Sequence, residues 1–399
     1  MASTNYPGSL DAYPVPNNGD TISVADHWLG PAVIGIETEL GTDPAGSHTN
    51  VKDRLDQVDS AMGFKNRIIG GNFSTNPWQR GTSFTGYTGA TSAYTADRFV
   101  AGGNQDGSID VLKTADAPTI AEAGIFTQHC LHANVDSEDT SIGASQYYEF
   151  YQFIEGYNIL DLGFGQSGTR YVTLSFWHKH TETGTNCVSI RNGAVNRSYV
   201  VEYTQSVSNA WEKQEITIPV DTTGTYDYTN QRALQIVFTI AAGTDRQTTA
   251  NAWQSGAYTA TSNQVNNLET LGNDFKIALV QLEAGDKATR FETRSVGQEL
   301  ALCKRYYEIV PVHYGSNTSS ITIKRNDYLW FEKRASPTAT LTVQYFNGSW
   351  VNPASTSVNY STMGGYVTII GTNIQYIGHG TSQVSGIYES GKLELAAEL

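Results

Sequence analysis

The feature of this sequence that most restricts its fold is a set of short runs in which apolar and polar residues alternate. Four of these runs lie at 171–179, 215–220, 234–240 and 275–283, and each is bounded by turns rich in Gly, Thr and Asn. Alternation with a period of two places the apolar side chains on one face of an extended strand. We therefore predict an antiparallel β-sandwich or jelly roll over residues 66–295.

The composition agrees with a mainly β protein. Charged residues make up 16% of the chain, whereas it contains 38 Gly and 23 Tyr. Long solvated helices use many Lys and Glu residues, which are scarce here. With 39% hydrophobic residues, the chain can bury a core and is too apolar to be disordered. A mainly helical fold and a disordered chain are both excluded.

Residues 1–65 differ from the rest and are predicted to form an extended arm followed by helices. Prolines near the start of the arm favour an extended segment. A first helix is expected between Pro31 and Gly41, because proline suits the first helical position and glycine the end. A second helix begins near Thr49 and carries an apolar seam at heptad a and d positions, made of Val51, Leu55, Val58 and Met62. The seam fits a helix packed on its own domain as well as it fits a short bundle that joins several copies.

A second β-rich block follows the sandwich. A short helical stretch at 296–307 leads into it, and no Pro-rich or Gly/Ser-rich spacer separates the two blocks. Alternating runs at 320–324, 338–345 and 366–370 predict strands. We therefore expect a C-terminal β-rich domain over residues 296–399.

Charge and cysteine content limit the partners and the compartment. The chain has 25 basic and 39 acidic residues, a net charge of −14, and no basic cluster that would bind nucleic acid or an anionic membrane. The first residues lack the basic and apolar regions of a signal peptide, and no run is long enough to cross a bilayer. Three widely spaced cysteines form neither a disulfide framework nor a metal knuckle. We expect a protein made in the cytoplasm with reduced thiols, with neither nucleic acid nor a membrane as a partner.

Motifs that resemble catalytic or cofactor sites have simpler interpretations. The glycine-rich string at 163–168 runs into a strand and not into a helix, so it predicts a β-turn and not a dinucleotide site. His178 and His180, like His129 and His132, have no third ligand at a recognisable spacing, which favours surface or interface histidines. A glycosidase pair among the many acidic residues stays open, because such a pair forms in space and not in sequence.

The aromatic residues are the strongest remaining indication of binding. Trp177 and Trp211 lie in or beside apolar strands, where core packing is expected. Trp253, Tyr258 and Trp350 lie in segments rich in Gly, Ser, Asn and Thr, which predicts loops. Exposed aromatic rings in loops suit contact with a sugar or a protein, so these three are candidate contact residues.

Several strings resemble proteins of tailed bacteriophages. Those at 67–73, 78–84 and 94–99 resemble the opening of sandwich domains in phage fibre and minor structural proteins, and the opening is shared with many carbohydrate-binding modules. The close of the sandwich at 280–292 and the junction at 297–308 look like the corresponding parts of those phage proteins. The block at 334–340 and the tail at 385–399 resemble their terminal β domain, and residues 33–62 are similar to N-terminal helices of phage virion proteins.

The resemblance implies a non-enzymatic structural protein of the virion: a tail fibre, a tail appendage or a head fibre subunit. It implies a homotrimer in which the seam of residues 51–62 meets its copies, an N-terminal region attached to other virion proteins, and an exposed tip that contacts a host-surface glycan or protein receptor. Carbohydrate-binding modules of this kind often hold a structural Ca²⁺ between their first and last strands. Asn72 and Glu283 occupy comparable positions here, and no other cofactor is expected.

Two other functions stay open on the sequence. One is a monomeric protein that works as a carbohydrate-binding module. The other is a depolymerase that cleaves capsule or lipopolysaccharide.

Overall fold

The computed structural model describes most of the chain after residue 63. The residues described are 64–88, 92–104, 106–312, 333–335, 337–346, 350–351, 366–370, 373–378 and 387–399. The predicted N-terminal helices, the seam of Val51, Leu55, Val58 and Met62, and the run at 320–324 lie outside them.

The chain divides into two compact units. One consists of residues 1–65 with 289–292, and the other of residues 66–288 with 293–399. In the first unit, the backbone N–H of Phe64 donates a hydrogen bond to Glu292 Oε1 (3.0 Å). The second unit contains all the strands named below.

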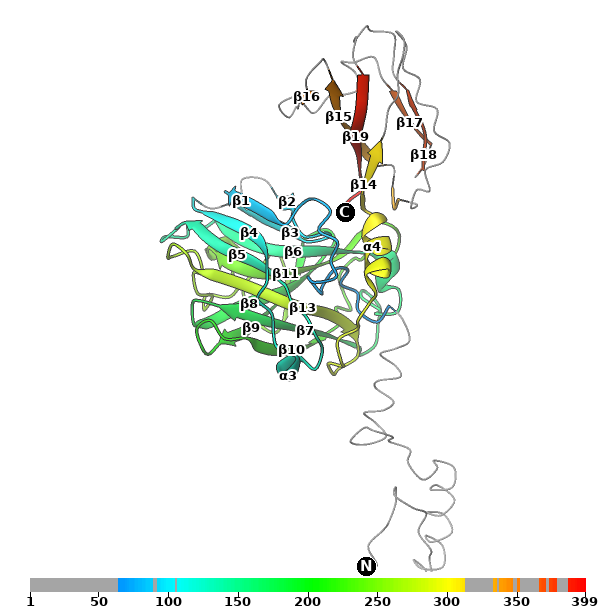
Figure 1. The fold of residues 1–399 in the computed structure, drawn as a ribbon. Coiled ribbons are helices and arrows are strands. Elements are labelled where there is room, and N and C mark those ends of the chain that lie inside the picture. The colour runs from blue at the N-terminus through cyan, green and yellow to red at the C-terminus, as the bar shows by residue number, and fades with distance from the viewer. Residues whose placement is uncertain are drawn as a thin grey trace, which may run out of the picture. The chain divides into compact units, whose positions relative to one another are not determined.

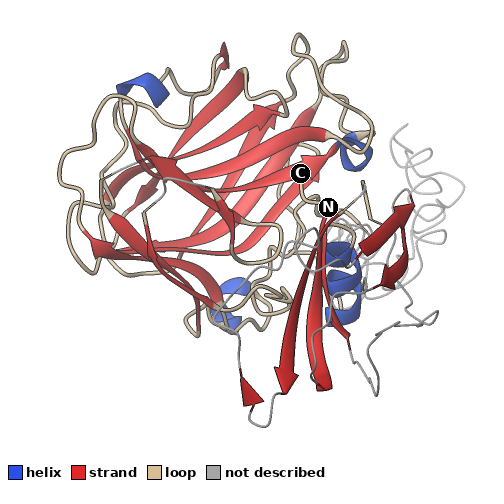
Figure 2. Cartoon of the chain, turned by 90° about the horizontal axis from the view of Figure 1, so that it is seen from above, coloured by secondary structure: helices blue, strands red, loops and turns tan. Residues whose placement is uncertain are grey.

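Two antiparallel sheets face each other and form a β-sandwich, as predicted (Figures 1 and 2). The six-stranded sheet has the order β1 (Ser83–Tyr87), β4 (Ser108–Thr114), β5 (Cys130–Ser137), β13 (Asp274–Ala284), β7 (Tyr171–His180) and β10 (Glu212–Pro219). The seven-stranded sheet has the order β12 (Trp253–Ser255), β9 (Arg197–Gln205), β8 (Gly184–Asn192), β11 (Arg232–Ala242), β6 (Tyr147–Glu155), β3 (Val100–Asn104) and β2 (Ala93–Tyr94).

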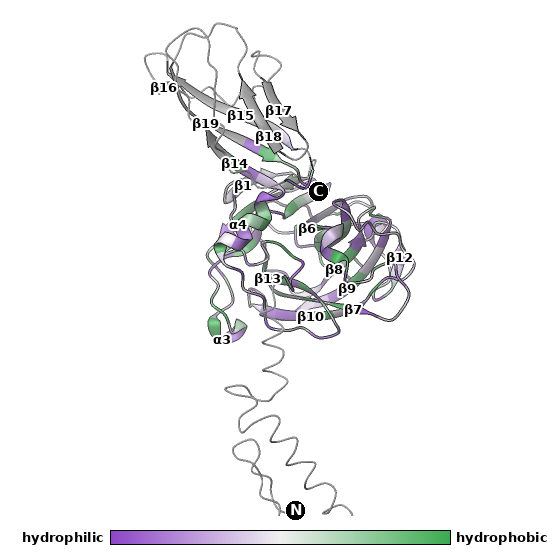
Figure 3. Ribbon diagram, turned by 90° about the vertical axis from the view of Figure 1, so that its right-hand side faces the viewer, coloured by the Kyte–Doolittle hydropathy of each residue, from purple (hydrophilic) through white to green (hydrophobic). Residues whose placement is uncertain are grey.

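The core lies between the sheets, where the alternating residues predicted it. In β7, Val172, Leu174 and Phe176 point inward and are fully buried, and Figure 3 shows hydrophobic and hydrophilic residues interleaved along the strands. The Phe176 ring makes edge-on contacts with Tyr203 and Phe238, with centroids 5.2 and 5.0 Å apart. Such contacts fix the distance between the two sheets.

The glycine-rich string at 163–168 is a turn, as predicted. Gly163, Gly165 and Gly168 all have positive φ angles, between 72° and 107°, which residues with a Cβ atom rarely adopt. The turn delivers the chain into β7 and leaves no helix to receive a phosphate.

The remaining described elements are short helices and a second group of strands. The helices are α3 (Ile120–Ala123), η1 (Gly156–Ile159), η2 (Thr244–Arg246) and α4 (Val296–Lys304). A four-stranded sheet has the order β14 (Tyr307–Val312), β19 (Ile387–Ala396), β15 (Thr338–Phe346) and β16 (Trp350–Val351), and a two-stranded sheet pairs β17 (Tyr366–Ile370) with β18 (Asn373–Gly378). The predicted helix at 296–307 and the predicted strands at 338–345 and 366–370 are therefore confirmed. None of the described helices has the length and apolar character that crossing a membrane requires.

The last residues of the chain pack against the sandwich. Leu399 joins a buried apolar cluster with Phe153 and Tyr306, and its backbone oxygen accepts a hydrogen bond from the Tyr94 hydroxyl (2.8 Å). Arg98, whose side chain is 1% exposed, forms an ion pair with Glu398. The C-terminal residues are therefore part of the sandwich's own packing.

Candidate functional site

An open cavity of 550 Å³ lies beside β9 of the seven-stranded sheet. It is lined by Glu202 of β9 and by residues 247–250 and 261–263. Its volume falls within the range of about 300–1,000 Å³ that is common for small-molecule sites.

One wall of the cavity belongs to a segment, residues 256–263, that we call the strap. The strap crosses the outer face of the seven-stranded sheet. The Ser198 hydroxyl of β9 donates to the backbone oxygen of Gly256 (2.5 Å), and the Thr239 hydroxyl of β11 donates to the backbone oxygen of Thr259 (2.8 Å). Because its backbone is tied to two strands, the strap holds its side of the cavity in a defined position.

Glu202 connects the sheet to the strap. Its Oε1 atom accepts hydrogen bonds from the Thr261 hydroxyl (2.5 Å) and from Asn263 Nδ2 (2.9 Å). Its Oε2 atom accepts no hydrogen bond from the part of the chain that the structure describes. The carboxylate is thus oriented by the strap through one oxygen and keeps the other as a free acceptor.

The chemistry of the lining suits hydroxyl groups. The side chains around Glu202 are hydroxyls and amides, from Gln247, Thr248, Thr249, Thr261, Ser262 and Asn263, with one Ala. These groups both donate and accept hydrogen bonds. The lining contains one carboxylate and no Lys, Arg, His or Cys, so it can bind a polar ligand but offers no acid–base pair.

The predicted contact residue Trp253 lies near this region but has a structural role. It belongs to β12, so the expectation that it lies in a loop is wrong, whereas its role as a contact residue stays a prediction. Its indole N–H donates to the backbone oxygen of Pro219 (2.8 Å), and its ring packs on Phe164 and Tyr199. The pairing of β12 with β9 overrides the turn-rich local sequence.

The other two predicted contact residues differ from each other. Tyr258 lies in the strap, is partly buried and packs against a small apolar cluster that includes Cys187 and Val200. It does not line the cavity. Trp350 is in β16 and not in a loop, and its side chain is not among those that the structure describes.

Asn72 and Glu283, the expected Ca²⁺ pair, lie at different positions along β13. The backbone N–H of Val280 donates to the oxygen of Gly71 (3.0 Å), which places Asn72 beside the middle of β13, roughly 13 Å along the strand from Glu283. Asn72 Oδ1 instead accepts from the Thr127 hydroxyl (3.2 Å). Among the described residues there is no group of three or more His, Cys, Asp or Glu side chains that could hold a metal. Ca²⁺ also takes amide and backbone oxygens, so the expected pair stays a prediction.

His178 and His180 are core residues, so the expectation of surface histidines is wrong. Both are fully buried. His178 Nδ1 is hydrogen-bonded to Gln205 Oε1 (2.8 Å), and His180 Nε2 to the Tyr203 hydroxyl (3.1 Å). The His180 ring stacks on Phe275 at 3.9 Å. Alternate residues of a strand share a face, so His178 and His180 lie on the same inner face of β7 as Phe176.

The buried histidine predicts that acid destabilises the fold. Burial lowers the pKa of His178 to about 4 and outweighs two effects that raise it, the hydrogen bond that His178 Nδ1 donates to Gln205 Oε1 and the charge of Glu212. Between pH 6.5 and 4 the unfolded chain binds this proton and the folded chain does not. The contribution of His178 to stability is therefore complete above pH 6.5 and falls by roughly 3 kcal/mol as the pH drops to 4.

Urea unfolding measured at several pH values would test this expectation with the variant His178→Phe. The variant should be less stable at pH 7, yet it should lose less stability than the wild type between pH 6.5 and 4. An equal loss in both proteins would contradict the assignment.

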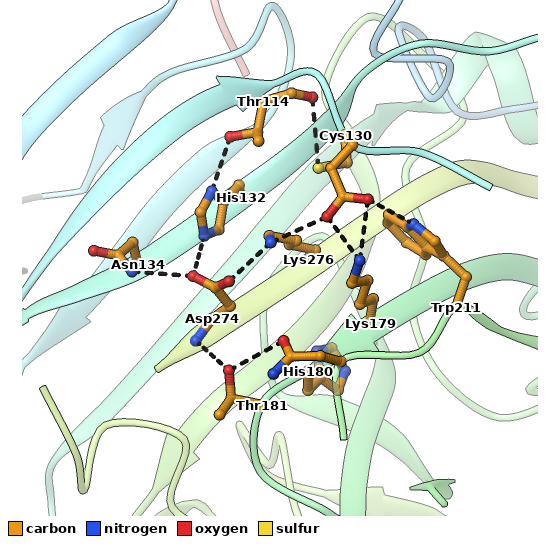
Figure 4. A network of polar contacts seen from close by, with 12 residues as sticks. Thr114, Cys130, His132, Asn134, Lys179, His180, Thr181, Trp211, Asp274 and Lys276 are labelled. Carbon is orange, nitrogen blue, oxygen red and sulfur yellow. Dashed lines mark hydrogen bonds and ion pairs between the residues drawn. The ribbon is translucent and has the colours of Figure 1, made fainter. Parts of the chain in front are cut away.

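A second polar cluster covers the outer face of the six-stranded sheet (Figure 4). Asp116 accepts from Trp211 Nε1 (3.0 Å), Lys179 (2.9 Å) and Lys276 (3.1 Å). Lys276 also donates to Asp274 (2.8 Å), which accepts further from His132 (2.6 Å) and Asn134 (3.0 Å). Burial alone would raise the pKa of Asp274, but these hydrogen bonds outweigh it and hold the pKa well below its usual value. The carboxylates are paired within the cluster, which indicates a structural network, and Trp211 belongs to this network and not to the core.

Glu202, Thr261 and Asn263 were not found by sequence reasoning. They are distant in sequence and belong to no motif, and only the strap brings them together. The dense run of Thr, Ser, Asn and Gln between 247 and 264 was the available signal, because polar loops of this kind often carry binding groups.

Comparisons with known proteins give matches among solved structures alone. No family model matches the chain, and no curated protein matches it. The enzymatically active domain of bacteriophage CBA120 tailspike protein 4 aligns with a TM-score of 0.30 and 13% identity, over 55% of this chain and 21% of that chain. TmCBM61 in complex with β-1,4-galactotriose aligns with a TM-score of 0.26 and 12% identity, over 54% of this chain and 97% of that one. A C-terminal family 22 carbohydrate-binding module of Clostridium thermocellum Xyn10B aligns with a TM-score of 0.25 and 10% identity, over 53% of this chain and 99% of that one.

Proposed function

We propose that the chain is a non-enzymatic structural protein of a bacteriophage virion, a fibre or fibre-like appendage subunit that contributes to host attachment by binding a surface glycan. The subunit is made in the host cytoplasm, assembles as a homotrimer and attaches to other virion proteins through its N-terminal region. The sequence strings at the sandwich opening and at 280–308 support the virion role. The observation that carries glycan binding is the hydroxyl- and amide-lined cavity at Glu202.

The cavity favours binding over cleavage. Glycosidases place two carboxyl groups about 5–10 Å apart across the scissile bond. The lining provides one carboxylate, Glu202. Its Oε1 atom is already occupied by Thr261 and Asn263. A sugar in this cavity would be held by hydrogen bonds and would leave unchanged.

A monomeric carbohydrate-binding protein would use the same cavity, so the oligomeric state separates the two functions. Light scattering on the purified full chain should give a mass near three times the 43.5 kDa of one chain. Three copies can multiply weak single-site contacts on one cell surface. A mass of one chain would favour the monomeric alternative.

The purified chain should bind glycans on an array and release no new reducing ends from the polysaccharides that it binds. Ser262 is exposed and lines the cavity, so Ser262→Trp should fill the cavity and abolish binding without unfolding the protein. Thr270→Trp, at an exposed position outside the lining, is the matched control and should bind normally. New reducing ends would contradict the non-enzymatic proposal, and binding that survives Ser262→Trp would place the glycan elsewhere.

A further inference from the structure

We infer that Glu202 makes this site selective for neutral glycans over acidic ones, an inference that rests on the proposed glycan-binding function. The site should bind neutral sugars, whose hydroxyl groups donate hydrogen bonds. It should reject sugars that carry carboxylate, phosphate or sulfate groups.

The charges around the cavity support this selectivity. Glu202 is the charged residue of the lining, and no Lys or Arg lines the cavity to balance it. Arg246, which precedes the lining segment directly, is already engaged: its guanidinium lies over the Tyr147 ring at 4.2 Å and donates to the backbone oxygen of Ala257 (3.4 Å). An anionic sugar would meet the negative charge of Glu202, which no cation of the lining balances, and at contact distance such a charge weakens binding roughly tenfold or more.

The Oε2 atom of Glu202 supports the preference for neutral sugars. A carboxylate oxygen accepts hydrogen bonds and cannot donate them, and such charge-assisted bonds are stronger than neutral ones. Because Thr261 and Asn263 both bind Oε1, Oε2 is the oxygen available for a ligand hydroxyl. A neutral sugar supplies donors for it, whereas an acidic group would place a second acceptor there.

The variant Glu202→Gln tests this with little change in shape. The glutamine Oε1 atom can still accept from Thr261 and Asn263, so the strap keeps its anchor, while an N–H donor replaces Oε2. Binding of the full-length chain would be measured on an array of neutral oligosaccharides and of oligosaccharides that carry uronic acids. We expect the affinity for neutral glycans to fall about tenfold and the relative affinity for acidic glycans to rise. Glu138→Gln removes the same charge from an exposed loop and should change neither.

The outcomes separate this inference from the proposed function. If the wild type binds acidic glycans as well as neutral ones, or if Glu202→Gln leaves the preference unchanged, the selectivity is wrong and glycan binding stands. If the wild type binds no glycan on the array, the proposed function fails, and the selectivity with it.

Discussion

Replacing Glu398 with alanine should lower the free energy of unfolding by about 3–5 kcal/mol, because it leaves a buried arginine without its counter-charge. The partner is Arg98, whose side chain is 1% exposed. Without Glu398, its guanidinium keeps the backbone oxygen of Phe153 (2.9 Å) and the Tyr306 ring (3.6 Å), neither of which carries a charge. Urea unfolding followed by tryptophan fluorescence would measure the loss.

Two comparisons establish the cause. The double variant Arg98→Met with Glu398→Leu removes both charges of this pair and should recover the part of the loss that comes from Arg98. Arg80, which also pairs with Glu398 (3.0 Å), keeps Asp97 as its partner in both variants. Glu215→Ala breaks an exposed ion pair, in which the side chain of Glu215 is 50% exposed and that of Lys213 is 42% exposed. This change should lower the free energy of unfolding by less than about 1 kcal/mol. If Glu398→Ala is no more harmful than Glu215→Ala, the C-terminal residues do not stabilise the sandwich in the way described.

The second large effect is expected in the core. Phe176→Ala should destabilise the protein by about 3–5 kcal/mol, through the lost burial and the cavity that remains. The ring is fully buried and contacts both Tyr203 and Phe238, so its loss removes contacts between the two sheets.

The matched control is Phe126→Ala, because Phe126 is 70% exposed. This change should alter stability by no more than about 0.5 kcal/mol. Similar losses for the two variants would show that Phe176 does not occupy the centre of the sandwich core.

The strands were the predictable part of this fold. Period-two alternation located β7, β10, β11 and β13, because each presents one apolar face to a single core. The interpretation of β11 was incomplete: its outward Val237 and Thr239 are fully buried as well. The strap, which no alternation signals, covers this strand through the bond between Thr239 and Thr259.

The roles of individual side chains were less predictable, because they depend on which strands pair and on which face becomes the inner one. Trp253 lies in a sequence typical of a loop, but the pairing of β12 with β9 turns it into a packed strand residue. His178 and His180 share a strand face, as expected for alternate residues, yet local sequence could not show that this face was the inner one. The sequence around Glu202 did not indicate a site, since its environment is formed by a polar segment about 60 residues later in the chain.

The most direct test of the glycan-binding account is a crystal structure of the chain with the neutral oligosaccharide that binds most strongly on the array. We predict density for the sugar in the cavity between Glu202 and residues 247–250 and 261–263, with a sugar hydroxyl within hydrogen-bond distance of Glu202 Oε2. A sugar bound elsewhere on the sandwich, such as over Trp211 on the outer face of the six-stranded sheet, with the cavity empty, would contradict it.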